Sequence, residues 1–430
     1  MKILEIIIGI ISLTVSVLLI GNVIYPLIAV LFRKKYLTYG IVEKRRYAVL
    51  ICARNEENVV GKLIESIQMQ DYPSELVDIY VLADNCNDNT AAEAKKSGAE
   101  VFVRNDQTKV GKGYALNYLY AKIILKKGDI YDGFFVFDAD NLLAKDYISK
   151  MNRSFKGGMH VVTGIRNTKN FADNWISACY GIGWFFQSGL LNKGRSVLGI
   201  PCFVTVTGFL IGSAVLKQKG GWNCFTLTED CEFTVDCALS GIEIGICSDA
   251  EIYDEQPTSL RVSWAQRLRW MRGKYQILGK YWKPLLKGIF SKKFLICFDS
   301  FSNIFPTGFF VFISAVFTVF QIAVSSGTFE TFVPSLISII AKTYLSMSLL
   351  GILTLIVWWK NIKVKSFKKI LLTLFYPIHV ASYVPITFVA AFRKIEWTPI
   401  KHNVVKSIRE FSGNESETEK QKIEHKEVRA

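Results

Sequence analysis

An apolar stretch that runs from Ile6 to Phe32 restricts how this chain can fold more than any other feature. A helix of about 27 residues is roughly 40 Å long, which is enough to cross the hydrocarbon core of a bilayer with some tilt. The stretch is longer than the core of a cleaved signal peptide, and it ends in the basic run Arg33-Lys34-Lys35. We therefore predict an uncleaved transmembrane helix over residues 1–35, followed by a cytosolic domain.

Three further apolar stretches lie within residues 300–394, and we interpret them as C-terminal membrane segments. If all three crossed the bilayer, the basic residues that follow would lie outside the cell, although lysine and arginine favour the cytosolic side. One of the three can therefore be re-entrant or interfacial. For residues 395–430 we predict a tail that is first basic and then charged and partly disordered. The three stretches are residues 304–324, 333–357 and 371–392.

The formal net charge is +15, and half of the residues are apolar. A positive excess of this size fits nucleic acid, an anionic lipid surface or a phosphate-bearing substrate. Basic clusters stand beside the apolar stretches, at Lys44-Arg45-Arg46 and over residues 360–369, as is typical of cytosolic flanks. We therefore predict a lipid bilayer and no nucleic acid as partners. Nine cysteines without a Cys-x-x-Cys pair fit a reducing compartment and indicate neither a zinc site nor a disulfide framework.

Short apolar runs alternate with amphipathic segments over residues 45–265. This alternation predicts an α/β, Rossmann-like domain with a mostly parallel sheet, helices on both faces and ligands at the carboxyl ends of the strands. The predicted strands are residues 47–52, 77–84, 101–103 and 134–137, and the predicted helices are residues 59–70, 91–97 and 114–125.

The last of these strands ends in Asp138-Ala139-Asp140. Side chains alternate along a strand, so Asp138 and Asp140 would point the same way, as two ligands of one Mg²⁺ or Mn²⁺ ion must. Bridging a nucleotide diphosphate, such an ion would orient the donor and stabilise the leaving group. An acidic turn without a metal is the alternative.

Motifs after the earlier strands can bind the rest of a nucleotide-activated sugar. Asn55 and Glu56 can reach a base or ribose, although an acidic loop at a strand end can equally cap a helix. Asp84 can accept hydrogen bonds from a uracil ring or a ribose hydroxyl. Lys112 stands between two glycines, where its ammonium can contact a diphosphate or belong to an ordinary loop.

Glu229 and Asp230 precede a helical pattern. A carboxylate at a helix N-terminus is often an N-cap. Near an acceptor hydroxyl, Asp230 would instead be a general base that takes the proton as the oxygen attacks the anomeric carbon, and one base suffices for an inverting displacement. We expect Asp230 and its neighbour Glu229 to be the catalytic pair.

Gln266, Arg269 and Trp270 share one helix face by their spacing, and they open a basic, aromatic segment over residues 266–295. Arg269 can contact phosphate and Trp270 can stack on a sugar ring. A basic, aromatic helix that merely lies at the membrane interface has the same pattern.

In this order the motifs resemble those of membrane-embedded, processive family-2 glycosyltransferases with a GT-A fold, which include cellulose, hyaluronan, chitin and poly-N-acetylglucosamine synthases. The resemblance covers about residues 45–290 and the membrane layout. The usual Cys-Gly-Thr acceptor loop is matched here only by Gly208. The resemblance implies that Asn55, Glu56, Asp84, Lys112, Asp138, Gln266, Arg269 and Trp270 bind a UDP-sugar, that Asp138 and Asp140 bind the metal, that Asp230 is the base, and that Gly208 and Trp270 contact the acceptor.

The same resemblance implies a multi-pass protein of the plasma membrane that elongates the nonreducing end of a polysaccharide and threads it through a channel. Our leading expectation is a β-glucan made from UDP-glucose. The alternatives are a polymer of N-acetylglucosamine or another N-acetylhexosamine, a non-processive transferase acting on a lipid phosphate, and an inactive membrane protein that keeps the fold to bind a nucleotide sugar. Accessory subunits and the linkage are left open.

Overall fold

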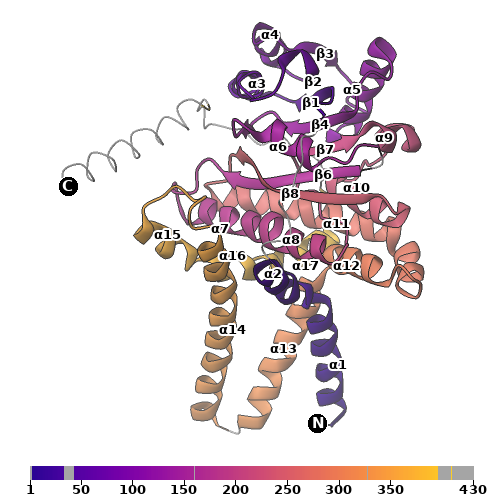
Figure 1. Ribbon diagram of the computed structural model, residues 1–430. Helices are drawn as coiled ribbons and strands as arrows, with labels where there is room; N and C mark the ends of the chain where they lie inside the picture. The colour runs from indigo at the N-terminus through magenta and orange to yellow at the C-terminus, as the bar shows by residue number, and fades with distance from the viewer. Residues whose placement is uncertain (1, 33–42, 159, 327, 396–407, 409–430) are drawn as a thin grey trace, which may run out of the picture.

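The computed structural model describes residues 2–32, 43–158, 160–326, 328–395 and 408. Figure 1 shows an α/β domain, a base of helices beneath it, and three long helices that project from this base: α1 (Lys2–Leu19), α13 (Thr307–Ser326) and α14 (Phe329–Val357). The predictions for the basic run after Phe32 and for most of the tail concern residues outside the described ones.

One eight-stranded sheet forms the domain, with the strand order β3-β2-β1-β4-β7-β6-β8-β5. The strands β3, β2, β1 and β4 are mutually parallel, β6 is parallel to β8, and β7 lies antiparallel between β4 and β6. The mostly parallel sheet is therefore confirmed. The strands are β1 (Tyr47–Ala53), β2 (Val77–Asp84), β3 (Glu100–Arg104), β4 (Gly133–Asp138), β5 (Leu142–Leu143), β6 (His160–Thr168), β7 (Phe209–Gly212) and β8 (Glu243–Asp254).

Helices cover both faces of this sheet because its central strands are apolar on both sides. In β4, Phe134 and Val136 pack into one core with α5, whereas Phe135 and Phe137 pack into a second core with α3. The predicted alternation of strands and helices is confirmed through residue 138. The helices of this part are α3 (Val60–Gln68), α4 (Thr90–Lys96), α5 (Lys112–Lys127) and, after β5, α6 (Tyr147–Ser154).

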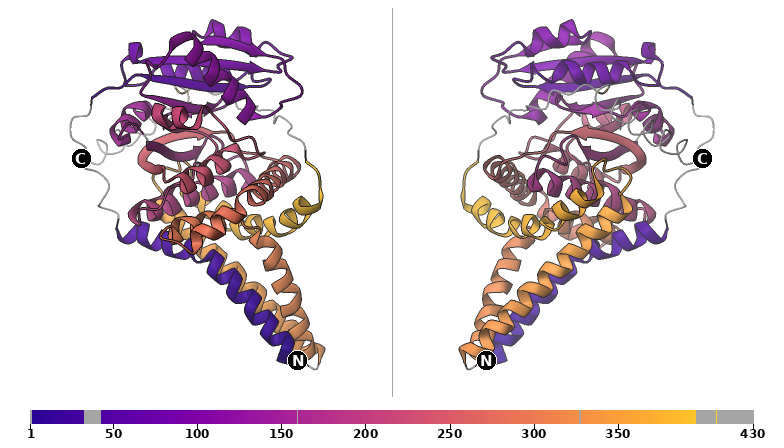
Figure 2. Two further views of the ribbon diagram at one scale, coloured as in Figure 1. Left: turned by 90° about the vertical axis from the view of Figure 1, so that its right-hand side faces the viewer. Right: turned by 90° about the vertical axis from the view of Figure 1, so that its left-hand side faces the viewer.

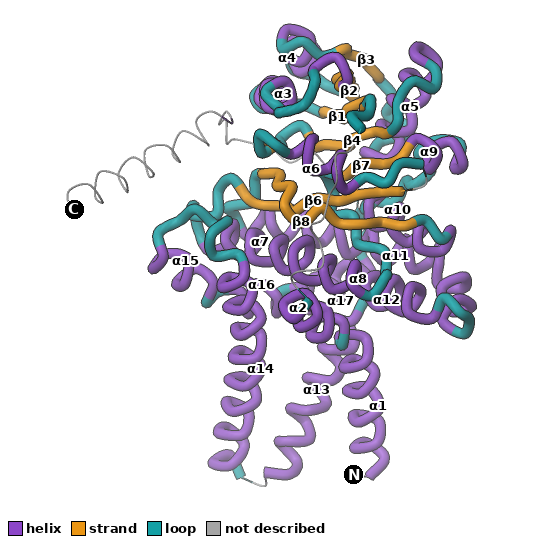
Figure 3. The backbone as a smooth tube through the Cα atoms, in the orientation of Figure 1, coloured by secondary structure: helices purple, strands orange, loops and turns teal. Residues whose placement is uncertain are grey.

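The helices of the base, drawn as part of the tube in Figure 3, come mainly from the chain after residue 174. The longest is α11, a continuous helix from Leu260 to Ile289, so the boundary predicted between residues 265 and 266 falls inside one helix. The others are α7 (Trp175–Trp184), the π-helical segment η2 (Phe185–Leu191), α8 (Asn192–Val197), α10 (Glu229–Ser240) and α12 (Phe294–Ile304), whereas α9 (Ser213–Lys219) packs beside β7 of the sheet.

The single helix expected over residues 6–32 is divided into α1 and α2 (Gly21–Leu31). Figure 2 shows α2 turning away from α1 to run along the base. A buried polar cluster explains the bend: the Tyr25 hydroxyl donates to Asp299 of α12 at 2.8 Å, and Asp299 also pairs with Arg195 of α8 at 2.9 Å. These contacts hold α2 against the domain.

The third C-terminal stretch is also broken, into α15 (Ser366–Thr373), α16 (Tyr376–Ala381) and α17 (Tyr383–Phe392). These helices pack on α7, α11 and α14 at the level of the base (Figure 2). Four stretches, including this one, are long and apolar enough to cross a membrane, and they indicate membrane association. Among the described residues after α14, the helices α15–α17 lie at the base beside the domain, and whether this stretch crosses the bilayer or is interfacial stays a prediction.

Candidate active site

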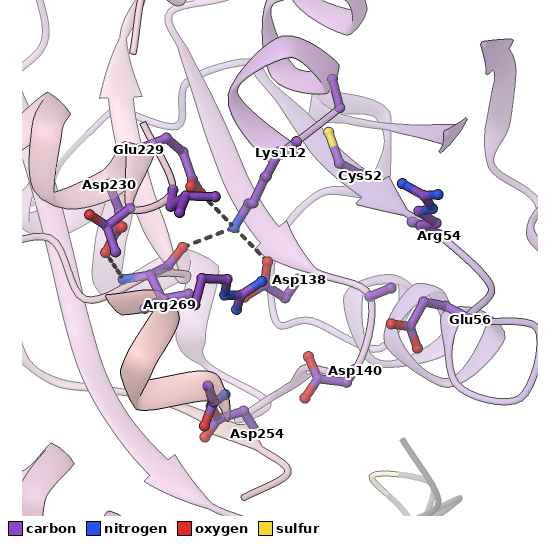
Figure 4. A pocket seen from close by; sticks show the side chains of 18 of the residues that line it. Cys52, Arg54, Glu56, Lys112, Asp138, Asp140, Glu229, Asp230, Asp254 and Arg269 are labelled. Atoms are coloured by element: carbon purple, nitrogen blue, oxygen red, sulfur yellow. Dashed lines mark hydrogen bonds and ion pairs between the residues drawn. The ribbon is translucent and has the colours of Figure 1, made fainter. Parts of the chain in front are cut away.

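One pocket lies at the carboxyl ends of β1, β2, β4 and β8, above α11 (Figure 4). The register explains how it forms, since Cys52 of β1 is level with Asp138 of β4, and Ala53 is level with Ala83 of β2. Strand ends that are distant in sequence thus meet at one edge of the sheet. Of the predicted site residues, ten line this pocket: Glu56, Asp84, Lys112, Asp138, Asp140, Glu229, Asp230, Gln266, Arg269 and Trp270.

Asp138 and Asp140 both face the pocket, but not by the strand alternation that was predicted. The strand β4 ends at Asp138, and Asp140 lies in the turn that follows. The turn is fixed by the backbone N–H of Asp138, which donates to Thr207 Oγ1 at 2.8 Å and to Asn141 Oδ1 at 3.1 Å. Figure 4 shows the two carboxylates directed to different parts of the pocket, Asp138 toward Lys112 and Asp140 toward Asp254.

Asp140 and Asp254 are the carboxylates that could hold a divalent cation on this side of the pocket. Asp254 lines the same pocket, and its Oδ1 is buried without a hydrogen-bond partner among the described residues. Burial and the nearby charge of Asp140 raise the pKa of Asp254 to about 6, against the opposing charge of Arg166. The described residues contain no group of three or more acidic, histidine or cysteine ligands. Two carboxylates are nevertheless a normal protein contribution where substrate phosphates and water complete the coordination of Mg²⁺.

Lys112 is the cation at the centre of the pocket. It is the first residue of α5, and Gly111 before it has a φ of +135°, which favours glycine. Its Nζ donates to Asp138 Oδ1 at 2.5 Å and to the Val206 carbonyl at 2.9 Å, and it lies 3.9 Å from Glu229 Oε1. Burial alone would lower the pKa of Lys112, but Asp138 and Glu229 outweigh it and the pKa is raised. The ammonium is therefore charged and can bind an anion.

Gly113 is needed for close packing rather than for flexibility. A Cβ at this position would overlap the carbonyl oxygen of Cys224, in the loop that leads to Glu229. We expect Gly113→Ala to destabilise the protein by about 2 kcal/mol, because the loop would have to move. The measurement is the thermal unfolding midpoint, with Gly279→Ala as a matched control, since a Cβ on Gly279 in α11 meets nothing within 4 Å. Equal midpoints for the two variants would contradict this packing role.

Asp84 is held by a buried ion pair. Its Oδ1 accepts from Arg104 Nε at 2.7 Å and from Asn85 Nδ2 at 3.2 Å. The pair fixes the carboxylate at the end of β2. Asn55, by contrast, does not line the pocket: its Oδ1 accepts the backbone N–H of Asn87 at 2.8 Å and so joins two loops at the pocket edge.

Glu229 and Asp230 occupy the first turn of α10, and Thr228 rather than Asp230 is the N-cap residue. Asp230 Oδ2 accepts the backbone N–H of Val206 at 2.8 Å. Burial raises the pKa of Asp230, and burial also raises the pKa of Glu229 to about 7, against the opposing charge of Lys112. Glu229 therefore titrates near neutral pH.

This shift gives a test by pH. A carboxyl whose pKa is raised on folding stabilises the folded state most below its unfolded value of about 4.5, and that contribution is lost as the pH rises through about 7. Glu229→Gln has no titratable carboxyl at this position, so its stability does not lose this contribution as the pH rises. We expect the unfolding midpoints of wild type and Glu229→Gln to agree at pH 4, below the unfolded pKa, and the variant to be more stable by roughly 3 °C at pH 8.5. A difference that does not change with pH would contradict the burial of a titrating Glu229.

The α11 side of the pocket carries Gln266, Arg269 and Trp270 on one face, as predicted. Trp270 packs edge-on against Tyr180 and Trp184, with ring centroids 6.0 and 5.6 Å apart. Burial lowers the pKa of Arg269, although Glu229, Asp138 and Asp230 oppose this. Several buried polar atoms of the pocket have no hydrogen-bond partner among the described residues, so they are available to a polar ligand or to water. They are Gln266 Oε1, Arg269 Nε, Arg166 Nη1, Asp254 Oδ1 and Thr228 Oγ1.

Sequence reasoning missed Arg166 and Asp254. Arg166 lies in β6 and stacks on Trp184, 3.7 Å from the ring centroid, while its Nε donates to Asp254 Oδ2 at 2.6 Å. Asp254 ends β8, and an acidic residue at the end of an apolar strand was the one signal that could have pointed to it.

Gly208 does not line the pocket. It has a φ of +67°, its N–H donates to the Val136 carbonyl at 2.9 Å, and its carbonyl accepts from the Tyr147 hydroxyl at 2.7 Å. Val206, two residues earlier, lines the pocket instead. The expected acceptor contact at Gly208 therefore has no geometric support, because this glycine joins β7 to β4 behind the site.

A family model described as glycosyltransferase like family 2 matches residues 45–273. A solved mannosyltransferase from Pyrobaculum calidifontis, in complex with GDP-Man and Mn²⁺, is similar to this chain with a TM-score of 0.58 and 15% identity, over 89% of this chain and 99% of that one. At this identity the likeness shows the fold alone, and the predicted GT-A fold is confirmed.

Two curated proteins show how functions vary among the relatives. A beta-monoglucosyldiacylglycerol synthase of Synechocystis sp. is 29% identical over 245 residues, which cover 55% of this chain and 49% of that protein. A poly-beta-1,6-N-acetyl-D-glucosamine synthase of Staphylococcus epidermidis is 24% identical over 260 residues, which cover 59% and 61%. The chain thus spans about half the length of the first relative and about three fifths of the second.

Proposed function

Because this chain belongs to glycosyltransferase family 2, we propose that its pocket transfers a hexose with inversion from a UDP-sugar, UDP-glucose in the first instance, to the hydroxyl of a membrane lipid. The observation that carries this proposal is the meeting of Lys112, Asp140 and Asp230 in one pocket whose α11 wall rests on the apolar helices of the base. Each part of the pocket has a chemical task.

The uridine end is assigned to Asp84, whose Oδ1 is held by Arg104 so that the carboxylate keeps one orientation toward a base or ribose. The diphosphate is assigned to Lys112 and Arg269, both of which line the pocket. Arg269 Nε has no hydrogen-bond partner among the described residues, so a phosphate oxygen would satisfy it.

A divalent cation would be held by Asp140, with Asp138 and Asp254 nearby. When bound, it would supply Lewis-acid stabilisation of the negative charge on the leaving UDP. The mannosyltransferase from Pyrobaculum calidifontis was solved with Mn²⁺ together with a nucleotide sugar, which fits this assignment.

The acceptor hydroxyl is assigned to Asp230, which lies across the pocket from Asp140 (Figure 4). Its carboxylate takes the hydroxyl proton as the oxygen attacks the anomeric carbon and the bond from that carbon to the diphosphate breaks. Burial raises the pKa of the neighbouring Glu229 to about 7, and Trp270 lines the same pocket. A single base and one displacement invert the anomeric configuration.

A lipid acceptor is favoured by the position of this pocket relative to the base. Trp270 contacts Tyr180, and the Tyr180 ring lies 4.9 Å from that of His379 in α16, so one aromatic layer separates the pocket from the apolar helices α15–α17. These helices expose large apolar side chains, among them Phe367, Ile378 and Phe392. A lipid headgroup at this surface lies close to the pocket. The relative from Synechocystis is named for a glucosylated diacylglycerol.

A polymer acceptor is the second candidate, and it keeps the leading expectation from the sequence open. The Staphylococcus relative is named for a polymer of N-acetylglucosamine, and Gln266, Arg269 and Trp270 are placed as the resemblance to processive synthases implies. Less favourable to it, the projecting helices expose many large apolar side chains, such as Val316, Phe320 and Ile340, as a lipid-facing surface does.

The test is a product assay with the full chain in lipid nanodiscs that contain diacylglycerol, radiolabelled UDP-glucose and Mn²⁺. We expect the label in the organic phase, on a lipid carrying one hexose by mass spectrometry. Label in an insoluble fraction that resists lipid extraction, from UDP-glucose or UDP-N-acetylglucosamine, would support the polymer instead. No transfer from either donor to lipid or polymer would contradict both candidates.

A further inference from the structure

The loop of residues 205–207 touches three parts of the site at once. The Val206 N–H donates to Asp230 Oδ2 at 2.8 Å, and the Val206 carbonyl accepts from Lys112 Nζ at 2.9 Å. One residue later, Thr207 Oγ1 accepts the N–H of Asp138 at 2.8 Å. One short loop thus joins the proposed base, the proposed diphosphate ligand and the proposed metal turn.

The backbone of Val206 is strained. Its φ is +65°, in the left-handed region, where a β-branched residue is a genuine outlier. The other described non-glycine residues with positive φ are Asn55 and Asn85, and asparagine tolerates this region well. A strained valine persists only when its surroundings hold it there, and such residues cluster at switch regions and active sites. For Val206 the holding groups are Lys112 and Asp230.

Binding of the donor competes with the hydrogen bond from Lys112 to the Val206 carbonyl. Its ammonium has three donors, and they face Asp138, the Val206 carbonyl and Glu229 (Figure 4). A diphosphate brings a much stronger acceptor into the same pocket, and charge-assisted hydrogen bonds to phosphate are stronger than one to a neutral carbonyl. The contact with the carbonyl is therefore the one that Lys112 gives up most easily.

We propose that Val206 couples the two halves of the reaction: Lys112 holds it in the left-handed conformation while the donor is absent, and the diphosphate releases it, so that its N–H leaves Asp230. The freed Asp230 oxygen then accepts a hydrogen bond from the hydroxyl of the sugar acceptor. Val206 is a positioning residue in this coupling. This inference rests on the proposed function, because it requires a diphosphate at Lys112.

Hydrogen exchange of the full chain in nanodiscs tests the coupling. Without ligand, the Val206 N–H is protected by its bond to Asp230. With UDP and Mn²⁺, we expect exchange in the peptide that spans residues 203–208 to rise about tenfold, while exchange in peptides around Asp84 and Lys112 falls. In Lys112→Met, we expect residues 203–208 to exchange fast before any nucleotide is added.

A substitution at the strained position gives an independent test. Glycine adopts positive φ without strain, so Val206→Gly should keep its hydrogen bond to Asp230 when UDP binds. We expect a kcat about tenfold lower, an unchanged KM for the donor and no rise in exchange at residues 203–208. Val206→Ala keeps a Cβ and should stay closer to wild type in both measurements.

The outcomes separate this inference from the proposed function. Protection around Asp84 and Lys112 without faster exchange at residues 203–208 would overturn the coupling and leave nucleotide binding intact. Wild-type kcat and a wild-type exchange response in Val206→Gly would also overturn it. Absence of protection anywhere in the pocket would contradict nucleotide binding itself. If Val206→Gly does not fold, the wild-type and Lys112→Met exchange data decide the question.

Discussion

Asp230→Asn is expected to lower kcat about 10³-fold, because the amide keeps the shape of the side chain but cannot take the acceptor proton. Nucleotide binding should change far less than kcat, since no direct contact with the nucleotide is assigned to Asp230. The measurement is the rate of UDP release with saturating donor and acceptor lipid, together with calorimetric binding of UDP.

Asp236→Asn is the matched control for this change. Asp236 lies on the same helix α10 and pairs with Lys219 outside the pocket, so its loss removes an equal charge without touching the site. It should retain near-normal kcat. If Asp230→Asn turns over within about threefold of wild type, the general base is another group, and Glu229 is the next carboxylate along the helix.

Asp140→Asn is expected to lower activity at least ~100-fold even at Mn²⁺ concentrations that saturate the wild type, because metal stabilisation of a leaving group is worth several kcal/mol. A readout that does not need turnover is the electron paramagnetic resonance of Mn²⁺ titrated with the protein and UDP. Wild type should bind Mn²⁺ only when UDP is present, since few protein ligands are available in the described residues.

The control for Asp140 is Asp146→Asn, at a carboxylate that pairs with Lys150 on the surface and has a side chain 47% exposed. It should bind Mn²⁺ and turn over like wild type. Tight Mn²⁺ binding by Asp140→Asn in the presence of UDP would contradict the assignment of Asp140 and would point to Asp138 and Asp254 as sufficient ligands.

The sequence was most informative where local pattern decides structure. The buried strand that ends at Asp138 has apolar side chains on both faces, as its uninterrupted run of Phe and Val predicted. The helix face of Gln266, Arg269 and Trp270 follows from spacing alone. The mostly parallel sheet and its ligand edge follow from the alternation of strands and helices, and ten of the predicted site residues meet in one pocket.

What the sequence could not supply depends on contacts between distant segments. Nothing near Arg166 in the chain indicates that β6 lies beside β8. The ion pair between Arg166 and Asp254 could therefore not be predicted from the sequence. The antiparallel insertion of β7 places Gly208 behind the site and Val206 in front of it, although both belong to one loop. The breaks between α15, α16 and α17 and their packing against the domain likewise depend on distant contacts, because apolar content alone predicted one continuous segment.

Transfer of the sugar of a UDP-sugar in one inverting displacement is the reaction that we propose for this pocket. The most direct measurement is ¹³C nuclear magnetic resonance of the product formed from UDP-[1-¹³C]glucose, whose anomeric carbon is α, by the full chain in nanodiscs. We expect a β-glycoside and one UDP released for each linkage formed. An α-glycoside, or UDP released together with free glucose and no glycoside, would contradict this reaction.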